Sequence, residues 1–248
     1  MPQFSDDLYL GAAWAGGAGP IGLNPDGTSY SEPSPIDVGV GPLGRIYVFD
    51  LVPATASNTS IVNAQAVAAA GAVTLAATAP ITLDRTGRCL RFASSNAGDT
   101  TQTVTVTGTD MYGQAMSETR TLNGTSAVNG TKAFYTVTSV TASAALTGNL
   151  SVGTRDAFGL PVRVTDAAYV VSAKWDATLA DNAGTFTAAD TTSPATATTT
   201  DVRGVFAQTG NAANGTRRLV MAIALNALAC GPNATRAGAF GVSQNLAT

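Results

Sequence analysis

The chain contains no histidine, and its 248 residues include only two lysines, Lys132 and Lys174, and two glutamates, Glu32 and Glu118. Histidine is the usual general base of enzymes and the commonest metal ligand, so its absence removes most acid–base, nucleophilic and metal-centred arrangements. We therefore expect no catalytic residues, no metal site and no cofactor. A structural or binding role is favoured over an enzymatic one.

Cysteine is also scarce, with Cys89 and Cys230 far apart in the sequence. Three readings are open: both are small buried hydrophobic residues, they form a bridge after the protein leaves a reducing compartment, or one takes part in chemistry. The last is disfavoured because no histidine is present to serve as a base partner.

Charge is low as well. Charged residues make up 12% of the chain, about half of the roughly 25% found in average proteins. The net charge is −3, and no basic block is present, so nucleic acid is not an expected partner. A surface that is weakly charged can instead pack against another protein with little charge desolvation.

Long hydrophobic runs are missing. The first residues lack the basic start and apolar core of a secretory signal, and the most apolar stretch, residues 64–80, is mostly alanine with polar interruptions. We expect no export signal, no membrane partner, and synthesis in the cytoplasm of the producing cell.

What the sequence does contain is alternation. In residues 102–109, Val104 and Val106 alternate with threonines, which is the two-residue period of a strand. Residues 110–113 carry turn-forming residues, and residues 115–122 are predicted to be the second strand of a hairpin. Further strands are expected at residues 45–49, 81–83, 90–92, 133–141, 150–152, 160–164, 169–175 and 219–228.

These strands and turns predict an all-β fold, one or more antiparallel β-sandwiches of immunoglobulin-like or jelly-roll type. Residues 1–45 are dense in glycine and proline and are predicted to form an extended N-terminal arm. Residues 46–166 form a β-sandwich region, and residues 167–248 form a second β region or complete the same domain. Within the latter, residues 190–200 are predicted to be an exposed loop or a weakly specified edge, and Asn214 and Gly215 a hairpin turn.

The arm carries more large apolar side chains than a free linker. They are either packed on their own domain or docked on a neighbouring subunit, and the second possibility makes them candidate partner-binding residues. The candidates are Phe4, Leu8, Tyr9, Trp14 and Tyr30.

Several motif matches are rejected. Gly39, Gly41 and Gly44 fit a dinucleotide-binding spacing, but Pro42 interrupts it and a strand follows where a helix is needed. Asn-x-Ser/Thr triplets coincide with turn sequences, and the carboxylates do not have the spacing of a calcium loop.

Several stretches carry a family resemblance: residues 8–11, 41–50, 104–114, 118–124, 132–140 and 153–161. Together they resemble virion proteins of tailed bacteriophages, and are most similar to head decoration, or cement, proteins of short-tailed phages. The resemblance implies a virion structural protein on the outer surface of the head, which binds the major capsid protein and clamps its neighbouring subunits. Such proteins have no catalytic residues.

Exposed strand edges and the low surface charge also favour self-association as a dimer or trimer. Two other classes stay open. One is a tail or fibre β-sandwich component that binds a host surface, and the other is a bacterial surface domain.

Overall fold

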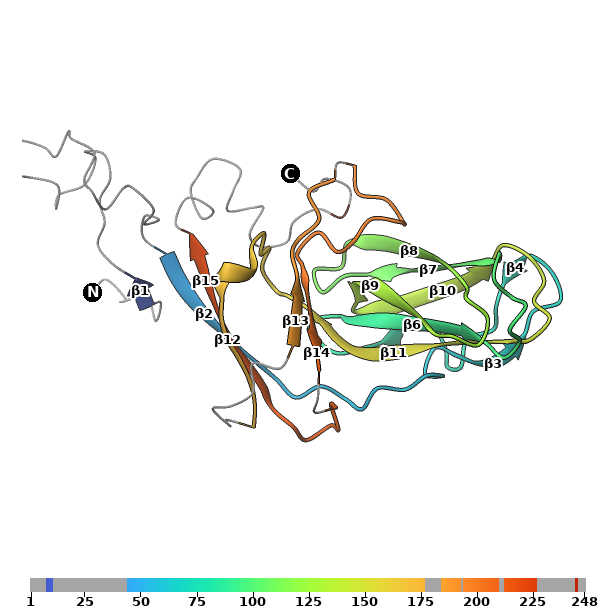
Figure 1. The fold of residues 1–248 in the computed structure, drawn as a ribbon, viewed down its shortest axis with the longest axis horizontal. Helices are drawn as coiled ribbons and strands as arrows, with labels where there is room; N and C mark the ends of the chain where they lie inside the picture. The colour runs from blue at the N-terminus through green and yellow to red at the C-terminus, as the bar shows by residue number, and fades with distance from the viewer. Residues whose placement is uncertain are drawn as a thin grey trace, which may run out of the picture.

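The computed structural model describes residues 8–10, 44–176, 184–192, 194–209, 212–226 and 244. These residues form strands in three antiparallel sheets and one short 3-10 helix, η2 (Ala167–Tyr169), with no α-helix among them. The prediction of an all-β antiparallel fold is confirmed (Figure 1). No described helix has the length and apolar character to cross a membrane.

Two of the sheets face each other as a sandwich. The five-stranded sheet has the order β4-β10-β7-β8, with β5 also paired to β10, and the six-stranded sheet has the order β13-β14-β11-β6-β9, with β3 also paired to β11. The strands of the first are β4 (Gly71–Ala72), β5 (Ile81–Thr82), β7 (Thr103–Thr109), β8 (Ala115–Thr121) and β10 (Thr136–Ala142). Those of the second are β3 (Val62–Ala66), β6 (Arg88–Ser94), β9 (Val128–Phe134), β11 (Asn149–Gly159), β13 (Gly184–Thr187) and β14 (Val205–Gln208).

The third sheet has four strands in the order β1-β2-β15-β12. They are β1 (Leu8–Leu10), β2 (Gly44–Leu51), β12 (Val170–Trp175) and β15 (Leu219–Asn226). Figure 1 shows this sheet at the opposite end of the molecule from β7, β8 and β10. Strands from both ends of the sequence therefore meet in one sheet.

The sandwich is filled by small and medium aliphatic side chains. Val104 and Val106 of β7 are fully buried and pack in one cluster with Phe92, Leu150 and Val152 from the facing sheet. Because the threonines that alternate with these valines point the other way, the period of two seen in the sequence places one face of β7 in the core.

A second core lies between the four-stranded sheet and the end of the six-stranded one. Leu219, Met221 and Ile223 of β15 are buried in it together with Trp175 and Phe158. The eleven-residue β11 enters both cores, since Val152 belongs to the first and Phe158 to the second. The two cores are thus joined through one strand.

The predicted hairpin of β7 and β8 is present, with Thr103 opposite Thr121 and Thr109 opposite Ala115. The predicted single strand over residues 133–141 is wrong. The chain changes sheets at Tyr135, so that β9 belongs to the six-stranded sheet and β10 to the five-stranded one. The apolar residues Phe134 and Val137 on the two sides of this corner are both buried, so the apolar pattern did not reveal the change of sheet.

Three other local predictions are corrected. Leu160, Val162 and Val164 are buried but lie beyond the end of β11 instead of forming a strand of their own. The two-residue alternation of Tyr169, Val171, Ala173 and Trp175 predicts that all four share one face. Val171 is instead 54% exposed, because a register shift between Val170 and Ser172 turns it away from the core.

The turn at Asn214 and Gly215 is present, since the Asn214 carboxamide oxygen accepts hydrogen bonds from the backbone of Thr216 and Arg217. It does not close a hairpin, because β15 pairs with β2 and β12 and not with the preceding strand β14. Instead, the backbone N–H of Gly215 donates a hydrogen bond to the carbonyl of Pro53.

We predict that Phe158→Ala destabilises the protein by about 3–5 kcal/mol, the usual cost of removing a fully buried aromatic ring. Phe158 is 0% exposed, its ring lies 6.4 Å from that of Trp175, and the Arg88 guanidinium lies 5.3 Å from its centroid. Chemical denaturation measures the change. The matched control is Val171→Ala on the exposed bulge, with an expected effect within about 0.5 kcal/mol; equal effects of the two variants would contradict a shared core at β11.

Candidate functional site

The loop between β13 and β14 lies across one open side of the sandwich. β8 is the edge strand of the five-stranded sheet and β9 that of the six-stranded sheet. The backbone N–H of Thr119 in β8 donates to the carbonyl of Ala197 at 2.8 Å, and the ammonium of Lys132 in β9 donates to the carbonyl of Thr196 at 2.6 Å. This segment, predicted to be an exposed loop or a weakly specified edge, is a loop with exposed residues that is nevertheless fastened to β8 and β9.

Buried charges fix the C-terminal end of this loop. One carboxylate oxygen of Asp201 accepts the backbone N–H of Ala133 at 2.9 Å. The guanidinium of Arg203 lies 3.1 Å from the carboxylate of Asp110, and both side chains are 0% exposed. Asp110 also accepts the backbone N–H of Gln114 at 2.9 Å. The turn between β7 and β8 and the loop after β13 are consequently held together by the same ions.

Glu118 is the buried centre of a second network. One of its oxygens accepts the backbone N–H groups of Thr131 at 2.6 Å and Lys132 at 3.3 Å, and the guanidinium of Arg120 at 2.8 Å. Its other oxygen is buried without a hydrogen-bond partner. A Cβ at position 130 would lie 2.5 Å from that oxygen, so any residue other than glycine there would displace the Glu118 carboxylate.

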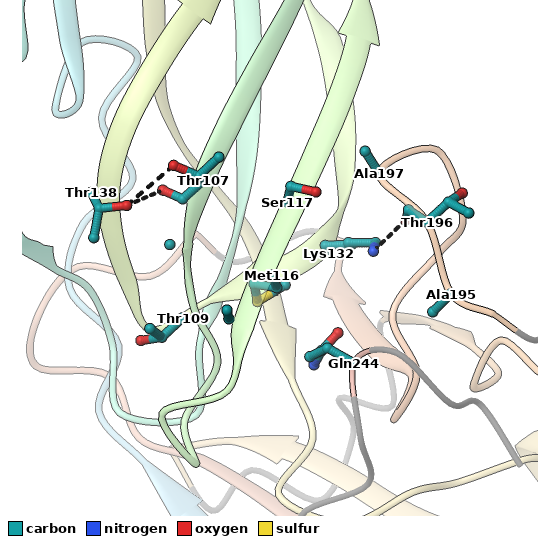
Figure 2. Close-up of a pocket in the computed structure, with 12 residues that line it drawn as sticks. Thr107, Thr109, Met116, Ser117, Lys132, Thr138, Ala195, Thr196, Ala197 and Gln244 are labelled. Atoms are coloured by element: carbon teal, nitrogen blue, oxygen red, sulfur yellow. Dashed lines mark hydrogen bonds between the residues drawn. The ribbon is translucent and has the colours of Figure 1, made fainter.

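A cavity of about 460 Å³ opens between the loop and the outer face of the five-stranded sheet (Figure 2). Its sheet side presents hydroxyl groups, and its loop side presents small side chains and backbone. Its lining residues are Thr107, Gly108, Thr109, Ala115, Met116, Ser117, Lys132, Thr138, Ala195, Thr196, Ala197 and Gln244. The volume falls within the roughly 300–1,000 Å³ typical of small-molecule sites.

Lys132 contributes the one ammonium group of this lining and is 2% exposed. Burial lowers the pKa of Lys132, while the nearby carboxylates of Asp201, Glu118 and Asp190 act in the opposite direction. Its hydrogen bond to the carbonyl of Thr196 uses one of the three N–H donors of an ammonium.

Gln244 lines the cavity from another part of the chain and is 3% exposed. Its side-chain nitrogen donates to Asp110 at 3.0 Å, and its backbone N–H donates to the Gln114 side chain at 3.0 Å. Its side-chain carbonyl oxygen is buried and has no hydrogen-bond partner. In a folded protein such an oxygen normally accepts a hydrogen bond, from the protein, from water or from a ligand.

The cavity can therefore donate and accept hydrogen bonds on several sides. Among the described residues, no group of three or more His, Cys, Asp or Glu side chains lies close enough to hold a metal ion. Cys89 is a free thiol that is fully buried, and burial raises its pKa well above the usual value. Cys230 lies outside the described residues.

The arm residues predicted to bind a partner do not belong to this cavity. Leu8 and Tyr9 lie in β1, opposite Ile46 and Arg45 of β2, at the edge of the four-stranded sheet. Phe4, Trp14 and Tyr30 lie outside the described residues.

The cavity itself was missed by sequence reasoning. The sequence contains one indication of it, because Lys132, one of only two lysines, directly precedes the apolar residues Ala133 and Phe134 of a strand. Gln244 had no signal at all, because its partner Asp110 is 134 positions away.

No protein-family model matches the chain, and no curated protein or solved structure is significantly similar to it. The resemblance to phage decoration proteins therefore remains a proposal.

We predict that Asp190→Asn removes the part of the folding stability that the Asp190 carboxylate contributes at neutral pH and loses in acid. Burial disfavours the ionised form of Asp190, but hydrogen bonds from Thr192 and Thr200 outweigh it and lower the pKa to about 2. Because this pKa is below that of an unfolded chain, about 3.9, the stabilisation is complete above about pH 4 and is lost as the pH falls towards 2.

Denaturant unfolding of both proteins between pH 7 and pH 2 checks this. The variant should be less stable at pH 7, and its stability should fall less steeply below pH 4. Parallel curves over the whole range would show that Asp190 does not fasten the loop.

Proposed function

We propose that this chain is a virion structural protein, a decoration or cement protein that binds the outside of a phage head and stabilises contacts between major capsid subunits. The sequence resemblance suggests this role, and the observation that best supports it is an apolar surface on the four-stranded sheet. We call it the outer face of that sheet and define it by Ile46, Val48, Val171, Ala222 and Ala224.

The outer face arises directly from the strand period. Tyr47 and Phe49 of β2 pack against the second core, so Val48 between them must point the other way. Val48 is 65% exposed and sits opposite Ala222 of β15. Val171 on β12 is the other exposed aliphatic side chain, and the half-buried Ala222 and Ala224 of β15 lie between the two strands. A contiguous apolar surface of this kind is typical of one that another protein covers.

Charge at this face comes from Asp50, Arg218 and Lys174. Asp50 and Arg218 form an exposed ion pair there, which lowers the pKa of Asp50 and raises that of Arg218 through their hydrogen bond. Lys174 of β12 lies on the same face, because it is opposite Val220, which is in turn opposite Asp50. A partner that buries the aliphatic side chains, at roughly 25 cal/mol per Å² of apolar area, must therefore also accommodate the Lys174 ammonium.

The predicted arm supports the same location. β1 pairs with β2, so that Leu8 and Tyr9 belong to the sheet that exposes Val48. An interface at this sheet would use arm residues and the outer face together. The occupant we propose is the major capsid protein, at the boundary between two of its subunits.

Binding across that boundary stabilises the shell by mass action. A protein that binds only the assembled subunits shifts the equilibrium towards assembly by RT ln(1 + [L]/Kd), about 2.7 kcal/mol at a hundredfold excess over Kd. We further propose that the chain occupies such sites as a dimer or trimer, because open edges such as β12 favour symmetric pairing.

A tail or fibre component is the second candidate, and the hydroxyl-lined cavity favours it. A fibre module binds a host surface and needs a ligand site of its own, which a cement protein does not.

Copy number separates these roles. We expect quantitative mass spectrometry of purified particles to find this chain in amounts comparable to the major capsid protein. A small fraction of that amount would indicate a tail or fibre part, and complete absence from the particles would refute a virion role.

We also expect Val48→Asp to weaken binding to heads that lack this protein by tenfold or more, since about 1.4 kcal/mol corresponds to a factor of ten. Sedimentation of heads with bound protein measures it. The control is Thr121→Asp, which places the same charge at an exposed position of β8 in the five-stranded sheet. Equal binding of the two variants would argue against the outer face as the docking surface.

A further inference from the structure

The outer face of the five-stranded sheet is covered with hydroxyl groups. Strand register places Thr105 of β7 between Thr119 of β8 and Thr141 of β10, and Thr107 between Ser117 and Ser139. We call this surface the hydroxyl face. Its members are Thr103, Thr105, Thr107, Thr109, Ser117, Thr119, Thr121, Thr136, Thr138, Ser139 and Thr141.

The hydroxyl groups are held in a fixed arrangement. Thr105 and Thr119 hydrogen bond across the strands at 2.8 Å, and Thr109 and Thr136 at 2.6 Å. A hydroxyl that makes one such bond still has a free donor or acceptor position, because it carries one proton and two lone pairs. The hydroxyl face therefore offers ordered hydrogen-bonding positions, with no charged or aromatic residue among its members.

The cavity at the β13–β14 loop lies at the border of this face. Thr107, Thr109, Ser117 and Thr138 belong both to the hydroxyl face and to the cavity lining. Figure 2 shows Thr107 and Thr138 on one side of the cavity, with Lys132, Thr196 and Gln244 on the other. A ligand in the cavity can thus continue onto the sheet.

The inner groups of the cavity have unused hydrogen-bonding capacity. The side-chain carbonyl of Gln244 is buried without a donor, and the carbonyl of Thr196 accepts only one proton of the Lys132 ammonium. The Gln244 carbonyl is thus a free acceptor, and the Lys132 ammonium is a donor with protons to spare. Both groups are buried, where an unsatisfied hydrogen-bonding group is costly. A ligand that both donates and accepts hydrogen bonds satisfies both.

Charge decides the class of ligand. Lys132, Arg120 and Arg203 are the cations around the cavity, and Glu118, Asp110, Asp190 and Asp201 are the carboxylates. Three positive charges and four negative ones surround the site, so it has no excess positive charge to attract an anion. Of these groups only Lys132 lines the cavity itself, and its ammonium disfavours a cation. A neutral ligand is therefore favoured.

From these observations we infer that the cavity and the adjoining hydroxyl face bind a neutral saccharide chain. One sugar residue occupies the cavity, where its hydroxyl groups meet Lys132, Gln244 and Ser117, and its C–H groups contact Met116 and Ala197. The following sugar residues lie along the hydroxyl face. This inference does not depend on the proposed position of the chain in a virion.

Ligand-detected saturation-transfer NMR on the full chain tests it. The probes are maltotetraose, cellotetraose, chitotetraose and mannotetraose, each at about 10 mM, with tetragalacturonate as the anionic comparison. We expect saturation transfer to at least one neutral tetrasaccharide, with a Kd of about 1 mM or tighter, which corresponds to about −4 kcal/mol. No transfer to any neutral probe, or transfer to tetragalacturonate alone, would overturn the inference.

Two substitutions locate the site. Ser117→Phe fills the cavity and should weaken binding at least tenfold, whereas Thr185→Phe adds the same ring at an exposed position of β13, outside both the cavity lining and the hydroxyl face, and should change it less than twofold. Thr138→Phe, at an exposed position that also lines the cavity, replaces Ser117→Phe if that variant does not fold. Equal losses at a cavity position and at Thr185 would overturn the placement.

Discussion

The buried ion pair between Arg203 and Asp110 is the interaction on which the functional end of the molecule depends. Taking both charges out of water is costly, and the loss of either partner leaves the other charge unpaired. Each is therefore held by further contacts: Asp110 accepts two backbone N–H groups of its own turn, and the Arg203 guanidinium lies 5.5 Å from the centre of the Tyr112 ring. Because these contacts join the turn after β7 to the loop before β14, they fix the walls of the cavity.

The second constraint is the sharing of β11 between two cores. If β11 ended where the first core ends, the inner face of the four-stranded sheet would have no strand to pack against. Because β11 continues past the first core, Phe158 reaches Trp175 and packs against this face. The inner face of the four-stranded sheet is thus buried against the end of β11, and the alternation of β2 leaves Val48 on the opposite face.

Local patterns predicted the elements whose partners are close in sequence. The β7–β8 hairpin could be predicted because its alternation, its turn and its partner lie within twenty residues or so. The change of sheet at Tyr135 could not, since the apolar residues Phe134 and Val137 near it are buried on both sides of the corner. For the same reason Asp110 could be assigned to a turn but not to an ion pair with Arg203, which lies 93 positions away. The cavity depends entirely on such distant contacts, and no residue pattern predicted it.

The two proposed surfaces make different demands on the chain and lie on different sheets. The outer face of the four-stranded sheet is aliphatic and suits the burial of area, whereas the hydroxyl face is polar and suits directional hydrogen bonds. Figure 1 places β2 and β15 at one end of the molecule and β7, β8 and β10 at the other. A protein docked through Val48 would therefore leave the hydroxyl face open to solvent, so that shell binding and saccharide binding can occur on the same molecule.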